Sequence, residues 1–186
     1  MAEIELGDPL ITAHQIERRV REMADQINGD YRDTGRPLSV ITVLKGACFF
    51  AIDLLRHLTL PTRLDFLQAS SYSGMGSTGE VTLHKDIRMP IAGTDVLLVE
   101  DIVDTGLTAS WLLRHLGGHS PASLKLCSLL DKPTRRLVTV PIDYLGFTIP
   151  NCYVVGYGID YDEAFRELPF VGTIATPGGT PCTASE

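Results

Sequence analysis

The sequence lacks an apolar run long enough to cross a membrane, and it lacks an excess of basic residues. Its longest apolar region, residues 41–55, is interrupted by Lys45 and Asp53, whereas a bilayer requires about 20 consecutive apolar residues. The formal net charge is -7 at pH 7, and nucleic acids and anionic membranes attract proteins through a basic face. Residues 1–5 show neither the basic start nor the apolar core of an export signal. We therefore predict no nucleic-acid partner and no membrane partner.

The four cysteines and five histidines show no spacing typical of a metal site. Cys48, Cys127 and Cys152 lie in apolar segments, which favours small core residues in a reducing compartment. We therefore expect a cytoplasmic protein. We interpret every histidine as structural or solvated; they are His14, His57, His84, His115 and His119.

The 186 residues suffice for one domain with a sizeable core, and 44% of them are hydrophobic. Apolar runs predict strands at residues 38–44, 62–69, 96–100, 124–130 and 142–147. Helices are predicted at residues 12–27, at residues 47–58 and around Trp111 with an end at Gly117. This alternation predicts an α/β fold with a mainly parallel sheet of about five strands, flanked by helices. We expect one domain over residues 1–175 and a disordered tail over residues 176–186.

Thr12 marks the predicted start of the first helix. Gln15 follows it three residues later, as in a capping box. The helix then presents one apolar face to the core, formed by Ile16, Val20, Met23 and Ile27.

Residues 70–80 form a segment rich in Ser and Gly, with almost no apolar anchor. An alternating Val81-Thr82-Leu83 follows, so the segment could be a flexible hairpin tip. A loop of this length in a compact domain is otherwise typical of a lid. We favour a lid, because neighbouring segments suggest chemistry that benefits from the exclusion of water.

The turn Thr105-Gly106-Leu107-Thr108 stands between a predicted strand and a predicted helix. Backbone N–H groups at a helix start lack partners within the helix, and the helix dipole adds positive charge there. Gly106 allows an anion to approach closely, and the hydroxyl groups of Thr105 and Thr108 add donors. The turn therefore predicts a cradle for a monophosphate. The alternative is an ordinary helix N-cap at Asp104 or Thr105.

Two adjacent acids, Glu100 and Asp101, end the strand that leads toward this turn. Neighbouring side chains on an extended chain point to opposite sides, so one acid can face a ligand while the other orients its surroundings. Paired acids at a sheet edge suit ribose hydroxyls or Mg²⁺, which binds few protein carboxylates and keeps its waters. The alternative is a solvated strand end.

Five blocks of the sequence, in order, resemble the hypoxanthine-guanine phosphoribosyltransferases, a branch of the type I phosphoribosyltransferase family. The blocks are Val43–Gly46, Ser71-Tyr72, Glu100–Ala109, Asp131–Pro133 and Tyr153–Arg166. The resemblance implies a type I phosphoribosyltransferase-like fold, with a small hood over the base from the N- and C-terminal parts. It implies a purine salvage enzyme that transfers the 5-phosphoribosyl group of phosphoribosyl pyrophosphate (PRPP) to N9 of hypoxanthine or guanine. The products are IMP or GMP and pyrophosphate, and the enzyme is expected to be a homodimer or homotetramer.

The resemblance also implies which residues bind the phosphate end of the substrate. Lys45, Gly46 and Arg166 would bind pyrophosphate, and Ser71 and Tyr72 would belong to a mobile loop. The PRPP site would comprise Glu100, Asp101, Thr105, Gly106, Leu107 and Thr108. The cofactor would be Mg²⁺, with Glu100, Asp101 and Asp160 as its ligands. In this family, the peptide bond before the loop lysine can be cis.

At the base, the resemblance implies that Asp104 is the catalytic residue. Asp104 would lie near N7 of the purine and exchange a proton as the N9 bond forms. Lys132 would donate to the 6-oxo oxygen, which predicts discrimination against adenine. Tyr153 would stack on the purine, and the backbone of Val154 and Asp160 would reach its edge.

Other interpretations stay open at this point. Taken singly, Lys132 could form a surface ion pair, Tyr153 could be a core residue and Arg166 could be solvated. The acceptor could be another base such as xanthine, because the sequence does not rank the base edge that Lys132 and Asp160 contact. The chain could also be a regulator that senses PRPP and binds RNA or DNA, but its acidic charge and short length argue against this.

Overall fold

Helices and strands alternate along the chain in a computed structural model that describes residues 6–71 and 81–174. The strands are β1 (Leu6–Ile11), β2 (Leu38–Leu44), β3 (Thr62–Ser71), β4 (Val81–Lys85), β5 (Asp95–Val103), β6 (Ser123–Asp131), β7 (Tyr144–Thr148), β8 (Val154–Val155) and β9 (Val171–Ile174). The helices are α1 (Ala13–Tyr31), α2 (Cys48–His57) and α3 (Leu107–Gly117), with a 3₁₀ turn at Pro133–Arg135. Every predicted helix and strand is present, and the ends differ from the prediction by a few residues.

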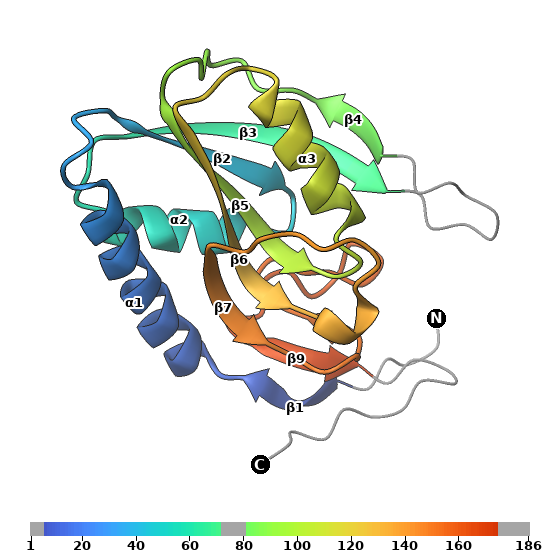
Figure 1. Ribbon diagram of the computed structural model, residues 1–186. Helices are drawn as coiled ribbons and strands as arrows, with labels where there is room; N and C mark the ends of the chain where they lie inside the picture. The colour runs from blue at the N-terminus through green and yellow to red at the C-terminus, as the bar shows by residue number, and fades with distance from the viewer. Residues whose placement is uncertain (1–5, 72–80, 175–186) are drawn as a thin grey trace.

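A six-stranded sheet forms the centre of the protein, in the order β4-β3-β2-β5-β6-β7 (Figure 1). Five of these strands are parallel, and β4 pairs with β3 in the antiparallel direction. β2 and most of β5 are buried, because helices cover both faces of the sheet. The predicted α/β fold with a mainly parallel sheet is confirmed, and β4 adds an antiparallel edge strand.

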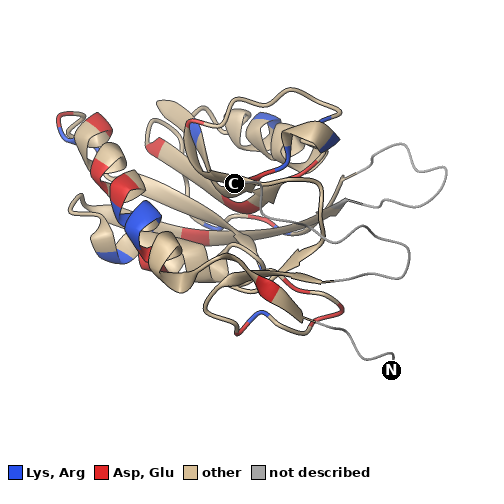
Figure 2. Cartoon of the chain, turned by 90° about the horizontal axis from the view of Figure 1, so that it is seen from below, with Lys and Arg blue, Asp and Glu red and all other residues tan. Residues whose placement is uncertain are grey.

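The helices α1 and α2 pack on one face of the sheet, and α3 packs on the other (Figure 1). The predicted capping box starts α1, since Gln15 Oε1 accepts the backbone N–H of Thr12 at 2.8 Å and Thr12 Oγ1 accepts that of Gln15 at 3.3 Å. The predicted apolar face of α1 is buried in the core. Figure 2 shows acidic and basic residues interspersed along α1, and Arg21 pairs with Glu17 at 3.3 Å.

A smaller antiparallel sheet, in the order β1-β9-β8, joins segments from the two ends of the described chain. Leu6 pairs with Ile174, and Pro9 pairs with Gly172, with register irregularities along the pair. Figure 1 shows β1 beside β9, below the central sheet. These strands were not predicted from the sequence, because four of the six residues of β1 are exposed and β8 has two residues.

Some predictions fall on residues that are not described. Tyr72, most of the predicted lid and the predicted tail lie outside residues 6–71 and 81–174. Cys48 and Cys127 are free, whereas Cys152 is disulfide-bonded, so the expectation of a reduced thiol is wrong at Cys152. Within the described ranges, no helix combines the length and the apolar character needed to span a membrane.

Candidate active site

A polar cavity of about 260 Å³ lies where β2 and β5 end, at the carboxyl edge of the central sheet. Open parallel sheets bind their ligands at this edge. Seven predicted site residues from four segments line the cavity: Lys45, Gly46, Glu100, Asp101, Thr108, Asp160 and Arg166. A larger cavity of about 500 Å³ between α1, α2 and residues 167–169 is lined by none of the predicted site residues. The smaller cavity is therefore the candidate active site.

The turn Lys45-Gly46 fits tightly between β5 and the C-terminal segment. β2 ends at Leu44, and the peptide bond from Leu44 to Lys45 is cis. A Cβ atom on Gly46 would lie 1.7 Å from Asp101 Oδ2, so glycine leaves room for that carboxylate. On the other side, a Cβ atom on Gly158, whose φ is +100°, would lie 2.1 Å from the carbonyl oxygen of Gly46. The two glycines therefore allow three segments to meet at the cavity.

Both predicted acids at the end of β5 line this cavity. Glu100 is 5% exposed, so the alternative of a solvated strand end is wrong for this residue. Burial and the charge of Asp101 raise the pKa of Glu100 well above its usual value, and no hydrogen bond or cation among the described residues offsets this. Burial raises the pKa of Asp101 to about 6, against the opposing backbone N–H of Ile102. Buried carboxyl groups with raised pKa values are typical of a functional site, and a bound cation would reverse both shifts.

Glu163 pairs with both cations that were predicted to bind pyrophosphate. Its Oε2 lies 2.9 Å from Lys45 Nζ and 3.1 Å from Arg166 Nη2. Arg166 also donates to the carbonyl oxygen of Gly158 at 2.7 Å and lies 2.9 Å from Asp160, while its Nε is buried without a partner in the described part of the chain. A partly buried guanidinium with a donor to spare suits an anionic ligand, and the alternative of a solvated helix residue is wrong. Glu163 was not predicted, because its place depends on a turn in which Asp162 and Glu163 have positive φ.

Helix α3 begins close to the cavity. Its N-cap is Gly106, with φ +85°, and no side chain among the described residues caps it. The alternative of a side-chain N-cap at Asp104 or Thr105 is therefore wrong. Thr105 Oγ1 accepts only a long hydrogen bond, 3.4 Å, from the backbone N–H of Leu107. Thr108, in the first turn of the helix, lines the cavity itself.

Asp104 and Lys132 follow the neighbouring strands β5 and β6. Val103 pairs with Asp131, and the carbonyl oxygen of Val103 accepts the backbone N–H of Lys132 at 3.0 Å. Lys132 is 8% exposed; burial lowers the pKa of its ammonium group, and the charge of Asp104 opposes this. The alternative of a surface ion pair is therefore wrong for Lys132. Asp104 itself pairs with Arg135 at 3.1 Å, a partner that was not predicted.

The residues predicted to contact the base edge differ in exposure. Tyr153 is 59% exposed, so the alternative of a core residue is wrong. Val154 is buried in β8, where it pairs with Thr173. Neither residue lines the 260 Å³ cavity. Ser71, the last residue of β3, leads into Tyr72, which lies outside the described residues.

Known proteins resemble this chain in sequence and in fold. A family model described as a phosphoribosyl transferase domain matches residues 9–162. A hypoxanthine-guanine phosphoribosyltransferase of Mycobacterium avium is 50% identical over 181 residues, which cover 93% of this chain and 89% of that protein. A hypoxanthine phosphoribosyltransferase of Salmonella typhimurium is 45% identical over 166 residues, which cover 89% of this chain and 93% of that protein. The crystal structure of a hypoxanthine-guanine phosphoribosyltransferase of Bacillus anthracis matches with a TM-score of 0.87 at 45% identity, over 94% of this chain and 100% of that chain.

Proposed function

The chain belongs to the family of phosphoribosyl transferase domains, and we propose from this premise that it is a purine salvage enzyme. It transfers the 5-phosphoribosyl group of PRPP to N9 of hypoxanthine or guanine, and it releases IMP or GMP and pyrophosphate. One observation carries the proposal: three acids, two cations and the first turn of α3 meet at one cavity. Relatives that cover most of the chain and are named for this reaction support it.

The proposed reaction separates charge, and the cavity holds groups of both signs. As the bond to the leaving pyrophosphate stretches, positive charge develops on the ribose and negative charge on the pyrophosphate. Lys45 and Arg166 stabilise the pyrophosphate once it replaces Glu163 as their partner. The backbone N–H groups at the start of α3 bind the 5′-phosphate. Separate subsites for the two phosphate groups hold the ribose between them.

Glu100, Asp101 and Asp160 are the residues that would hold Mg²⁺. Carboxylate oxygens are the ligands that Mg²⁺ prefers, and Glu100 is a buried acid without a counterion among the described residues. When bound, Mg²⁺ supplies positive charge that offsets the charge of the leaving pyrophosphate. Glu100 and Asp101 also accept hydrogen bonds from ribose hydroxyls.

At the base, proton exchange and selection of the 6-oxo group belong to different residues. Asp104 exchanges a proton with N7 while the N9 bond forms. Lys132 donates to the 6-oxo oxygen; an adenine amino group does not accept this bond and would leave a buried ammonium group unpaired. The exposed ring of Tyr153 stacks on the purine, and the backbone of Val154 and Asp160 contacts its edge.

We also propose a cytoplasmic homodimer or homotetramer. Multi-angle light scattering after size-exclusion chromatography measures the assembly state. A monomer at the concentrations of the activity assay would contradict this part of the proposal.

An absorbance assay tests the reaction directly. PRPP and Mg²⁺ are mixed with the protein and, in separate cuvettes, with hypoxanthine, guanine, xanthine or adenine. We expect conversion of hypoxanthine or guanine and no conversion of adenine. Conversion of xanthine alone would replace the proposed acceptor. Binding of PRPP without conversion of any base would contradict the enzyme and favour a PRPP sensor.

A further inference from the structure

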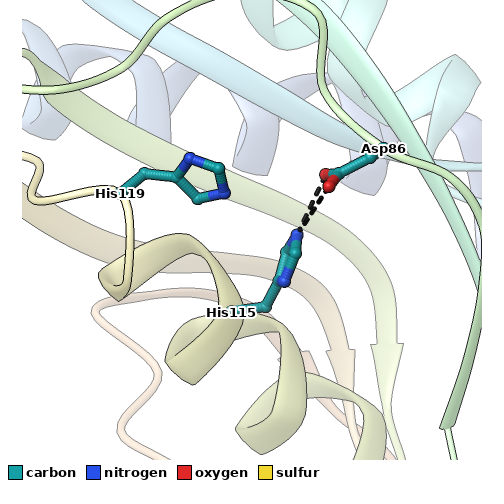
Figure 3. A group of neighbouring side chains, drawn as sticks. All are labelled: Asp86, His115 and His119. Carbon is teal, nitrogen blue, oxygen red and sulfur yellow. Dashed lines mark hydrogen bonds and ion pairs between the residues drawn. The ribbon is translucent and has the colours of Figure 1, made fainter.

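Outside the candidate active site, the structure brings together three potential metal ligands, Asp86, His115 and His119. One ligand atom from each residue lies within 4.8 Å of those of the other two. Figure 3 shows the three side chains gathered around a common point. Asp86 follows β4, His115 lies in the last turn of α3, and His119 follows that helix. His115 and His119 come together because side chains four residues apart lie on the same side of a helix end.

Two contacts fix the orientation of His115. Its Nε2 lies 2.9 Å and 3.1 Å from the two carboxylate oxygens of Asp86. The indole of Trp111 stacks on the imidazole, with the ring centroids 5.0 Å apart and the planes at 9°. His115 therefore presents a nitrogen toward the cluster from a ring that packing already holds in place.

The backbone around His119 is also fixed. Its N–H donates to the carbonyl oxygen of Leu116 at 3.0 Å, which continues the turn that ends α3. The N–H of Gly93 donates to the carbonyl oxygen of Ser120 at 2.9 Å, so the β4–β5 connection that carries Asp86 is tied to this turn. The rings of His115 and His119 meet edge to face, with centroids 5.4 Å apart.

We propose that Asp86, His115 and His119 form a binding site for a transition-metal cation of the Zn²⁺ class. Two imidazole nitrogens and one carboxylate oxygen are a known ligand set for Zn²⁺, with water in the fourth position. Ligand bonds of about 2.1 Å in a tetrahedral site place donor atoms roughly 3.4 Å apart. The exposed side chains of Asp86 and His119 have room to rotate into this geometry. Mg²⁺ does not suit the site, because it prefers ligands that are all oxygen.

A bound ion would join the β4–β5 connection to the C-terminal end of α3. The other end of the same helix forms the proposed phosphate cradle, so the two sites are separate in the fold. An ion that binds the folded state and not the unfolded state raises the stability of the protein. This inference does not depend on the proposed transferase reaction.

Isothermal titration calorimetry with Zn²⁺ and protein that carries no affinity tag tests the proposal. The buffer contains excess Mg²⁺, so that Mg²⁺ rather than Zn²⁺ occupies the carboxylates of the candidate active site. We expect one equivalent of Zn²⁺ to bind. His119→Asn should weaken this binding by about 100-fold or more, since loss of residues that merely orient a ligand costs about 10–100-fold. His14→Asn is the matched control, because it removes a histidine of α1 outside the cluster. Co²⁺ should also quench the emission of Trp111, the single tryptophan, in the parent and not in the His119→Asn variant.

Two results would overturn the proposal. One is the absence of saturable Zn²⁺ binding by the parent protein. The other is equal Zn²⁺ affinity in the His119→Asn and His14→Asn variants, which would place the ion elsewhere. Both variants should keep full PRPP-dependent activity, so an inactive parent would contradict the proposed reaction and leave this titration interpretable.

Discussion

Gly158 lies against the turn that carries Lys45, and its replacement by alanine shows how rigidly this contact holds the cavity together. The added Cβ would lie 2.1 Å from the carbonyl oxygen of Gly46 and 3.2 Å from its carbonyl carbon. Both are backbone atoms, so no side-chain rotation relieves the overlap. Ordinary non-bonded contacts need about 3.5 Å, so one of the two segments must move by roughly 1 Å.

Two costs add in the Gly158→Ala variant. Alanine at φ +100° strains the backbone by about 1–2 kcal/mol, and overpacking costs about 1–3 kcal/mol more. Gly35→Ala is the matched control, because Gly35 has φ +65° and no atom within 4 Å of the added Cβ. It should therefore lose about 1–2 kcal/mol of unfolding free energy from strain alone.

Urea unfolding and steady-state kinetics measure both effects. We expect Gly158→Ala to lose more unfolding free energy than Gly35→Ala, by about 1–3 kcal/mol. We expect its kcat/KM for PRPP to fall about 100-fold, since a 1 Å misplacement of binding groups costs that much. Gly35→Ala should keep the parent kcat/KM. If both variants lost the same unfolding free energy and kept full activity, the contact between Gly158 and the turn at Gly46 would not be rigid.

Three further predictions concern single carboxylates. Asp104→Asn should lower kcat by about 10²–10⁴-fold in steady-state assays, with little change in KM for PRPP; unchanged turnover would remove Asp104 from the mechanism. Glu163→Gln removes the carboxylate that pairs with both Lys45 and Arg166, so isothermal titration should show tighter binding of inorganic pyrophosphate, and weaker binding would contradict the competition. Burial raises the pKa of Asp95, but hydrogen bonds from Arg36 and Ser123 outweigh this effect and lower it. The ionised carboxylate of Asp95 therefore stabilises the fold above about pH 4, and this stabilisation is lost as the pH falls below that value. Asp95→Asn should lower the free energy of unfolding, measured with denaturant, by about 1–3 kcal/mol at pH 7 and by less at pH 3. An equal loss at both pH values would contradict a link between the ionisation of Asp95 and stability.

The central sheet was predictable because its strands are buried on both faces. A strand such as β2, with six of its seven residues buried, appears in the sequence as a mostly apolar run in which only Ser39 and Thr42 are polar. The capping box of α1 added a local signal for a helix start. β1 offered neither signal, because its exposed residues pair with β9 through an irregular register that depends on residues far away in the sequence.

The candidate site was predictable where its residues end a strand. Glu100 and Asp101 follow a buried apolar run, so their place at the sheet edge follows from the fold class. The position of Glu163 depends instead on a tight turn in which Asp162, Glu163 and Phe165 all have positive φ. Such backbone conformations are uncommon outside glycine and leave no pattern in the sequence. The pairing of Glu163 with Lys45 therefore needed the structure.

The pairing of β1 with β9 also sets an order of assembly during synthesis on the ribosome. Every strand of the central sheet lies within residues 38–148, so all of these strands are synthesised before β9. Chains begin to fold from the N-terminal side as they leave the ribosome. β1 is made first, yet it has no strand partner until residues 171–174 arrive. A nascent chain that has emerged as far as residue 150 would therefore carry every strand of the central sheet, while β1 would still lack its strand partner.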